Sequence, residues 1–511
     1  MYNQVKSAAL VGVEGHMVTV EVDTSSGFPR FDVVGMPDSS VKESTDRVRT
    51  AIKNSNFEFP MERITVNLAP AELRKEGAGY DLAIAIGIML CKEVIKGNKV
   101  DGYLVLGELS LNGEIRAVNG VLPMVHSAFK MGVTKCVVPI DNAKEAAVIE
   151  GVEAVGVSHI KEVVAFLNNE LNIEPTIVDV QKLFKSRTGI YPYDFKDVKG
   201  QENVRRALEV AAAGMHNVMM IGPPGSGKTM MAKRLPSILP DVSFEESIAI
   251  TKIYSVSGKM KGDKPLVVNR PFRSPHHTIS NAALIGGGGV PKPGEISLAH
   301  NGVLFLDELP EFQKNVIEVL RQPLEEGEVT ISRVSATIDY PARFMMVCSM
   351  NPCPCGYYPD PEKCSCTPYQ IKRYLNKVSG PLLDRIDLHV EASTVDFNAI
   401  NKIEDSESSE EIMGRVLESQ AIQKARYSEM GITYNAHLQA KDIDKICVLD
   451  EPSKVMIRYA FEKMGLSARA YHRVLKVART IADLEASDII HENHIAEAIQ
   501  YRTLDRKYWN R

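Results

Sequence analysis

A glycine-rich stretch near the middle of the chain has the residue types and spacing that bind phosphate. The segment 222-GPPGSGKT-229 fits the pattern G-x-x-x-x-G-K-T, follows the apolar run 218-VMMI-221 and opens a helical pattern. In such loops glycines let backbone N–H groups curl around phosphate oxygens, the lysine reaches the β- and γ-phosphates, and the last hydroxyl binds Mg²⁺. The residues expected to bind a nucleoside triphosphate are Gly222, Pro223, Pro224, Gly225, Ser226, Gly227, Lys228 and Thr229.

Two further apolar runs end in polar residues that suit triphosphate hydrolysis. The run 303-VLFL-306 leads into Asp307 and Glu308, and a third run, 344-FMMVCS-349, leads towards Asn351. Strands that end in this way deliver their side chains to one rim of a sheet, where Asp307 suits the Mg²⁺ shell and Glu308 suits polarisation of the attacking water. Asn351 is expected to orient that water; the alternative is an asparagine that only forms a turn.

Half of the eight cysteines fall within the fourteen residues 353-CPCGYYPDPEKCSC-366. Their spacing is C-x-C-x₈-C-x-C, and four thiolates suit tetrahedral Zn²⁺ in a structural site with no open coordination position. Reduced thiols without a metal and redox chemistry remain alternatives. The clustered residues are Cys353, Cys355, Cys364 and Cys366. The lone cysteines on apolar segments, expected to be buried thiols in a reducing cytoplasm, are Cys91, Cys136, Cys348 and Cys447.

The bulk composition is that of a globular chain with about three domains. The 511 residues are 44% hydrophobic and carry a net charge of −5, so any contact with a polyanion must come from a local basic patch. The N-terminal stretch MYNQVKSAALVGVEG has no apolar signal core, so we expect no export. The longest apolar run, 82-LAIAIGIMLC-91, is about half as long as a membrane span and predicts a buried helix in a cytoplasmic protein without membrane contact.

Periodicity divides the chain into an α/β region, a linker, a second α/β region and a helical end. In the first region, residues 18–24 and 31–36 read as strands, and residues 39–55 read as a helix with a serine N-cap. The expected bounds are 1–168 for the first domain, 169–195 for the linker, 196–395 for the nucleotide-binding core with the cysteine loop 353–366, and 396–511 for a helical lid. The acidic stretch 402–411 is expected to be a solvated loop, and Val474, Val477, Ala478 and Ile481 to mark one apolar helix face.

Five segments together resemble the magnesium-chelatase-like AAA+ ATPases of the YifB/ComM family. They are GPPGSGKT, LFLDEL, SMNPCPCG, GPLLDRIDLH and 270-RPFRSPHHT-278, and they occur in the family's order over essentially the whole chain. The resemblance implies a Lon-protease-like (ribosomal S5 domain 2-like) α/β domain, a P-loop AAA+ α/β domain and a C-terminal helical lid. It also implies ATP and Mg²⁺ as cofactors and a homo-oligomer, as a rule a hexamer with ATP at subunit interfaces.

The resemblance assigns two arginines to catalysis. Arg385, in 379-SGPLLDRIDLH-389, matches the arginine finger that projects into a neighbouring subunit's site, and Arg469 matches the sensor-2 arginine at the start of a lid helix. Arg473 is the rival for the second role. Either Arg385 or Arg469 could instead pair with acidic residues.

The segments between these motifs include a basic patch. From Ser255 to His277 there are five lysines and arginines and one acidic residue, and residues 327–344 read as a hairpin. By resemblance these match the helix-2 insert and the pre-sensor-1 hairpin, which face the central pore, where cations suit a phosphodiester strand. The expected DNA contacts are Lys259, Lys261, Arg270, Arg273 and Arg333; alternatively Arg270, Arg273, His276 and His277 brace the nucleotide site.

The N-terminal region is similar to a Lon-protease domain that lacks the Ser–Lys dyad. The positions of the nucleophilic serine and the lysine fall on Gly79 and Leu122, which supply neither a nucleophile nor a proton-accepting amine. We therefore expect a domain that docks partners rather than a protease.

The resemblance implies an ATP-driven ring motor on DNA, a helicase or branch-migration factor in homologous recombination or transformation, with recombination proteins as possible partners. The alternatives are a magnesium-chelatase-type or protein-remodelling ATPase that acts on a protein client, and a binding module in which ATP only switches assembly. The intact Glu308, Asn351 and Arg385 argue against the binding module, because a switch needs no hydrolysis residues.

Overall fold

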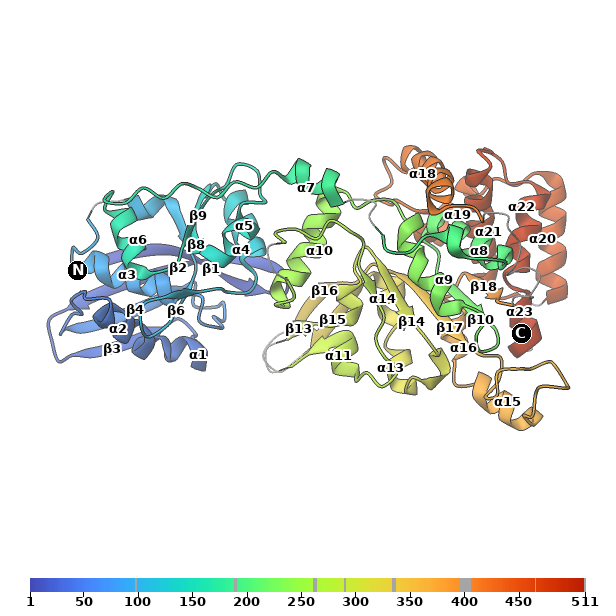
Figure 1. Cartoon of the computed structure of the whole chain (residues 1–511), viewed down its shortest axis with the longest axis horizontal. Coiled ribbons are helices and arrows are strands. Elements are labelled where there is room, and N and C mark those ends of the chain that lie inside the picture. The colour runs from blue at the N-terminus through green and yellow to red at the C-terminus, as the bar shows by residue number, and fades with distance from the viewer. Residues whose placement is uncertain are drawn as a thin grey trace.

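Three regions follow one another along the long axis of the molecule, in chain order (Figure 1). The structure, a computed structural model, describes residues 1–96, 99–187, 191–260, 264–288, 291–332, 337–394, 406–464 and 466–509. Two of the expected DNA contacts, Lys261 and Arg333, lie outside these described residues. No helix among the described residues is both long and apolar enough to cross a bilayer.

The N-terminal region is an α/β unit built on a seven-stranded mixed sheet, in the order β3-β4-β2-β1-β5-β8-β9. Successive strand side chains alternate between two apolar clusters, one with α2, α3 and α6 and the other with α4. The strands are β1 Tyr2–Val11, β2 Glu14–Ser25, β3 Arg30–Val34, β4 Arg63–Ala69, β5 Tyr103–Val105, β8 Lys135–Pro139 and β9 Glu153–Val157. The helices are α1 Ser39–Lys42, α2 Ser44–Asn54, α3 Asp81–Cys91, α4 Val121–Lys130, α5 Ile140–Ala146 and α6 Ile160–Leu167.

Most predicted elements of this region are confirmed, with one correction at a helix start. Helix α3 is buried at every position, as the apolar run predicts. The helix expected over residues 39–55 is divided into α1 and α2, and its first cap is Asp38, not a serine. The Asp38 carboxylate accepts a hydrogen bond from the Val41 N–H at 2.8 Å, because aspartate satisfies the free N–H groups of a first turn as well as serine does.

The linker is more ordered than its weak periodicity suggests. Thr176 pairs with Ala154 at the outer edge of β9, and residues Val180–Arg187 form the helix α7. Val178 and Val180 pack against the apolar cluster of the N-terminal domain. Contacts with a preformed surface therefore order a segment that has little intrinsic preference.

The core is a five-stranded, all-parallel sheet in the order β11-β14-β17-β10-β18. The strands are β10 Val218–Ile221, β11 Phe272–Arg273, β14 Val303–Leu306, β17 Met345–Met350 and β18 Leu388–Glu391. The main helices are α8 Glu202–Gly214, α9 Lys228–Arg234, α10 Phe244–Val256, α11 Asn281–Ile285, α12 Glu295–Leu298, α13 Lys314–Glu318, α14 Arg321–Glu326, α15 Pro368–Leu375 and α16 Gly380–Leu383. The predicted hairpin is confirmed as β15 Glu328–Ser332 and β16 Thr337–Pro341, paired antiparallel.

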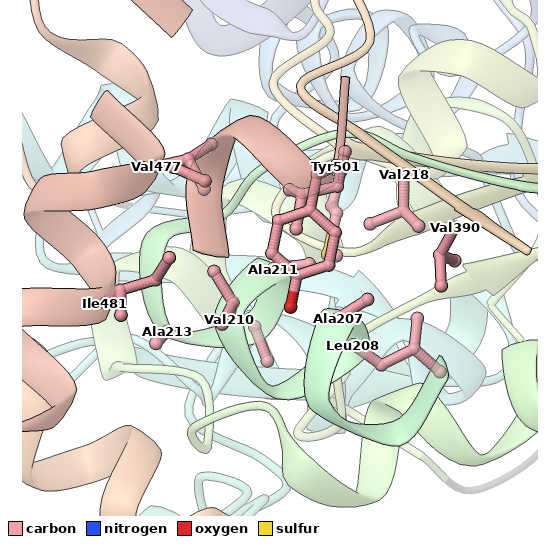
Figure 2. Close-up of a cluster of buried hydrophobic side chains, with 14 of the residues drawn as sticks. Ala207, Leu208, Val210, Ala211, Ala213, Val218, Val390, Val477, Ile481 and Tyr501 are labelled. Carbon is pink, nitrogen blue, oxygen red and sulfur yellow. The ribbon is translucent and has the colours of Figure 1, made fainter. Parts of the chain in front are cut away.

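The C-terminal region is helical and packs on the core through α8. Figure 2 shows side chains of α8 between Val218 and Val390 of the sheet and Val477 and Ile481 of the lid helix α21. The predicted apolar face of α21 is confirmed, since Val474, Val477, Ala478 and Ile481 are all buried. The lid helices are α18 Ser409–Arg426, α19 Ala440–Ile446, α20 Glu451–Met464, α21 Ala468–Leu484, α22 Glu492–Gln500 and α23 Thr503–Trp509.

The end of the acidic stretch 402–411 is helix rather than loop. Ser408 caps α18, and Glu410 and Glu411 occupy its first turn, where their charges favour the positive end of the helix dipole. Residues 402–405 of this stretch lie outside the described residues.

The N-terminal domain docks on α10 of the core, beside α4 (Figure 1). Ser255 of α10 donates a hydrogen bond to Glu145, whose carboxylate also accepts the Leu122 N–H at 2.9 Å. Burial raises the pKa of Glu145. Lys252 reaches Glu14 at 3.1 Å. The apolar residues of the core that join the N-terminal cluster are Ile248, Leu266 and Val268.

Candidate nucleotide-binding site

Parallel pairing of three neighbouring strands brings the predicted hydrolysis residues to one edge of the core sheet. Strand β17 lies between β10 and β14, and all three run in the same direction. The segment 222–229 follows β10, Asp307 and Glu308 follow β14, and Asn351 follows β17. Ligands of open α/β sheets bind at this carboxyl edge of the strands.

The backbone of the 222–229 loop requires its glycines. Gly225 and Gly227 have φ angles of 77° and 82°, in the left-handed region that glycine adopts without strain. A Cβ on Gly222 would collide with the carbonyl of Ala392, which follows β18. Gln201 Nε2 donates to the Ser226 carbonyl at 3.1 Å and so supports the loop from the start of α8; the sequence reasoning did not identify this glutamine.

Lys228 lies at the centre of the loop and is largely buried. Its ammonium group donates to the carbonyl oxygens of Gly222 and Pro223, both at 2.8 Å, and to Asn351 Oδ1 at 3.3 Å. Burial lowers the pKa of Lys228, and the nearby Asp307 and Glu308 carboxylates oppose this shift. The ammonium therefore sits where phosphate oxygens could replace carbonyl oxygens as its partners.

The two acidic residues after β14 have different surroundings. Thr229 Oγ1 donates to Asp307 Oδ2 at 2.7 Å, so the hydroxyl and carboxylate expected to bind Mg²⁺ are already adjacent. The Ser349 hydroxyl donates to Asp307 Oδ1. The same Ser349 Oγ accepts a hydrogen bond from the Glu308 N–H at 3.3 Å. Glu308 adopts a φ of 54°, and its side chain is 57% exposed, which leaves the carboxylate open to solvent.

Ser349 is a positioning residue that the sequence reasoning missed. It is fully buried in β17 and touches both acidic residues, through a side-chain oxygen of one and the backbone of the other. The sequence does contain a signal for Ser349. It is a small polar residue near the end of a buried apolar strand, two positions before Asn351.

The four clustered cysteines converge as a metal site requires. Their Sγ atoms all lie within 4.8 Å of one another, and three separations are 3.3, 3.6 and 3.8 Å. Sulfurs about 2.3 Å from a tetrahedral Zn²⁺ lie roughly 3.8 Å apart, so the donor set fits this ion. Backbone N–H groups of Gly356 and Tyr358 donate to Cys353 Sγ at 3.2 and 3.4 Å and so fix the position of this sulfur. The four lone cysteines are buried, as predicted.

The cysteine loop lies against the phosphate-binding loop. Gly356 has a φ of 89°, and a Cβ there would collide with the ring of Pro224. Asn351 is two residues before Cys353, so the same segment holds the Lys228 partner and the first thiol. The cysteine loop therefore forms one side of the candidate nucleotide site.

The arginines assigned by resemblance differ in their surroundings. Arg385 is largely buried, forms an ion pair with Glu325 of α14 at 2.5 Å and donates to the Pro381 carbonyl at 2.6 Å. Arg469 lies exposed in the first turn of α21. Its rival Arg473 forms an ion pair with the buried Asp387, so its charge already has a partner within the chain.

One of the expected DNA contacts, Arg270, is buried and paired within the chain. Arg270 is 5% exposed and donates to the Pro240 and Asn301 carbonyls at 2.6 and 2.8 Å. It also forms an ion pair with Glu246 at 3.1 Å, so in this structure it braces the start of α10 instead of facing solvent. Lys259 and Arg273 remain candidates, because their side chains are 43% and 29% exposed.

The positions expected for a protease dyad hold no dyad. Leu122 is completely buried, and its N–H is bonded to Glu145 at the contact with α10. The nearest atom to a Cβ on Gly79 would belong to Val118 at 3.9 Å.

Comparisons with known proteins cover nearly the whole chain. Three family models match: "Subunit ChlI of Mg-chelatase" at residues 20–142, "Magnesium chelatase, subunit ChlI" at 194–400, and "Magnesium chelatase, subunit ChlI C-terminal" at 406–502. Competence protein ComM of Haemophilus influenzae is 43% identical over 98% of this chain and 97% of its own length. The YifB protein of Escherichia coli is 44% identical over the same shares.

A more distant relative is the magnesium-chelatase 38 kDa subunit of Cereibacter sphaeroides, which is 27% identical over 32% of this chain and 53% of its own length. Identities of 43% and 44% to ComM and YifB over nearly the full length, together with the matched domains, show that the chain belongs to the YifB/ComM family of magnesium-chelatase-like AAA+-type ATPases.

Proposed function

We propose that this protein is an ATP-hydrolysing ring motor that acts on DNA, as a helicase or branch-migration factor. The observation that carries the proposal is the grouping of Lys228, Thr229, Asp307, Glu308 and Asn351 at one sheet edge, in a chain that also carries a basic insert between α10 and α12. The resemblance to a relative named as a competence protein favours DNA over other clients.

The site residues divide the work of hydrolysis. Lys228 exchanges its carbonyl partners for the β- and γ-phosphate oxygens of ATP, and Asn351, 3.3 Å from the ammonium, orients the attacking water. The exposed Glu308 carboxylate polarises that water. Thr229 and Asp307 would hold Mg²⁺, which supplies charge neutralisation on the phosphates.

The basic insert supplies the proposed DNA contacts. Lys259 and Lys264 are exposed and Arg273 is partly exposed, and all three lie between α10 and α12. Each phosphate that such a cation neutralises releases counterions, so binding through this patch weakens as salt rises. Six copies in a ring would multiply a patch that is modest in one chain.

The test is the steady-state ATPase rate with and without single-stranded, duplex and four-way-junction DNA at two salt concentrations. Stimulation by DNA that falls as salt rises is the expected result. A rate that no DNA changes would overturn the DNA motor. It would favour the second candidate, a chelatase-type or protein-remodelling ATPase, for which the partial match to magnesium-chelatase subunits is the supporting observation.

We also propose that the four cysteines hold a structural Zn²⁺ that braces the phosphate-binding loop through the Gly356–Pro224 contact. Replacing Cys366 with serine is expected to lower bound zinc from about one ion per chain to near zero, because a hard hydroxyl replaces a thiolate. Metal analysis of the purified chain is the measurement, and Cys447→Ala in the lid is the control. A Cys366→Ser chain that keeps its full zinc content would contradict the assignment.

Arg385 is proposed to act in a neighbouring subunit's site within a hexamer, with Arg469 as the sensor of the same chain's nucleotide. Arg385→Ala is expected to lower turnover by about 10³-fold, because the finger's charge is lost from the transition state. Mixing these chains with Lys228→Ala chains should restore part of the activity, measured as ATPase rate against mixing ratio. Mixed rings that form and stay inactive would refute action between subunits.

A further inference from the structure

The turn between β1 and β2 of the N-terminal domain lies between two elements of the core. It consists of Gly12 and Val13 and is followed by Glu14, and the ends of both strands reach the core beside α10 and β16 (Figure 1). Glu14 forms an ion pair with Lys252 of α10 at 3.1 Å. A Cβ on Gly12 would lie 2.9 Å from the Ile338 side chain of β16, so the turn packs directly against the hairpin of β15 and β16.

Val13 is the apolar anchor of this turn. It is buried, and it belongs to a cluster of the core that includes Ile331 of β15 and Tyr340 of β16. Among the described residues it is the one member of that cluster from the N-terminal domain, and it belongs to neither cluster of its own domain. Its burial therefore favours docking of the two domains rather than folding of the first.

The basic insert is anchored on the N-terminal domain at both of its ends. Where the insert leaves α10, Gly258 lies against Asn119, since a Cβ on the glycine would lie 3.2 Å from the amide oxygen. Where it returns, Leu266 and Val268 are buried in an apolar cluster of the N-terminal domain. A cavity of about 700 Å³ between these ends is lined by both domains, with Lys264 on the side of the core.

We propose that the N-terminal domain positions the DNA-contacting elements of its own chain by holding the insert and the hairpin at a fixed spacing. Glu145 and Asn119 hold the root of the insert, and the β1–β2 turn holds the hairpin; these contacts are called the clamp below. The effect on DNA rests on the proposed function, whereas the clamp itself rests on contacts within the chain. Binding to a strand costs less when the loop that binds it is already ordered. A domain without a protease dyad thus contributes to recognition of a polyanionic strand.

The clamp is separable from the ATP site. Among the described contacts, the β1–β2 turn and Glu14 meet Lys252 and the hairpin, and none meets the loop 222–229. Opening the clamp should therefore weaken DNA binding, while the KM for ATP and the DNA-free kcat keep their wild-type values. A merely structural contact would instead lower the DNA-free kcat and the DNA-stimulated rate together.

The experiment uses the full-length chain with Val13→Ser and Glu14→Gln combined, which removes the apolar anchor and the ion pair of the clamp. The matched control combines Leu111→Ser and Glu153→Gln. Leu111 is an exposed apolar residue of another turn in the N-terminal domain, and Glu153 pairs with Lys135 inside that domain at 3.2 Å. The control therefore makes the same chemical changes away from the core.

The DNA dependence of the ATPase rate should change in two ways in the clamp variant. The DNA concentration for half-maximal stimulation should rise about tenfold, because Lys259 and Lys264 must then be ordered as DNA binds. A plot of its logarithm against the logarithm of salt concentration should become shallower by roughly one to two, the contribution of the phosphate contacts of two cations. Glu14→Gln alone, which alters one exposed carboxylate, should raise the half-maximal concentration roughly twofold.

Hydrogen exchange of the DNA-free chain tests the clamp by itself. Backbone N–H groups of residues 264–268 and 337–341 should exchange faster in the clamp variant than in the wild type and the control, because these segments open more often without their anchors. Exchange as slow as in the wild type would overturn the clamp.

Faster exchange with an unchanged half-maximal DNA concentration would overturn the link between the clamp and DNA. A DNA-free kcat that falls as far as the stimulated rate would overturn it as well, since a structural role predicts that result. Failure of the proposed function is distinguishable, because it appears as a wild-type rate that no DNA changes, while hydrogen exchange is measured without DNA.

Discussion

Replacing Lys228 with alanine is expected to abolish ATP binding or turnover, with a fall in kcat/KM of about 10²–10³-fold or more. The ammonium is the one buried cation that contacts the phosphate-binding loop among the described residues, and the carbonyls it now bonds lie where phosphate charge must be neutralised. The measurements are ATP affinity by equilibrium binding and the steady-state rate of phosphate release.

The matched control is Lys233→Ala, which removes a lysine from the exposed face of the same helix, α9. It should bind and hydrolyse ATP as the wild type does, so a general effect of lost positive charge is excluded. A Lys228→Ala chain with unchanged affinity and rate would refute the assignment of the loop. Both chains should melt at similar temperatures, since the β10 strand and α8 carry the packing beneath the loop.

Glu308→Gln is expected to separate ATP binding from hydrolysis. Without a carboxylate to polarise water, kcat should fall by about 10²–10⁴-fold. Affinity for ATP should persist, because Lys228, Thr229 and Asp307 keep their contacts with one another and with the loop. Single-turnover hydrolysis measured beside equilibrium binding distinguishes the two effects.

Glu311→Gln is the control for Glu308, since it removes a neighbouring carboxylate that pairs only with Lys377 at the surface among the described contacts. Its kcat should match the wild type. A Glu308→Gln chain that hydrolyses ATP at the wild-type rate would show that another group activates the water.

The local signals in the sequence were enough to predict that the residues of the proposed nucleotide site gather at one edge of the core sheet. The spacing of Gly222, Gly227 and Lys228 predicts a loop, because glycine adopts the left-handed φ of 82° at Gly227 without strain. Apolar runs before Asp307 and Asn351 predicted buried strands, and parallel pairing brings such strand ends together. Helix α3 and the apolar face of α21 also followed from composition and periodicity, which tertiary packing reinforced.

Neighbour relations between distant segments could not be predicted in this way. Arg270 reads as a cation of a basic patch, yet the carbonyls of Pro240 and Asn301 enclose it. Ser349 became a positioning residue only because β17 lies beside β14. Helix α7 formed where periodicity was weak, because the N-terminal domain offered it an apolar surface.

The same distinction separates the cysteine loop and the β1–β2 turn from the motifs around them. The sequence specifies four cysteines but not that Gly356 touches Pro224, nor that the β1–β2 turn touches Ile338. Glycine spacing, caps and apolar runs act within a few residues, so the sequence encodes them locally. Contacts between segments far apart depend on how strands pair and how much surface the chain buries, and these are set only when the whole fold has formed.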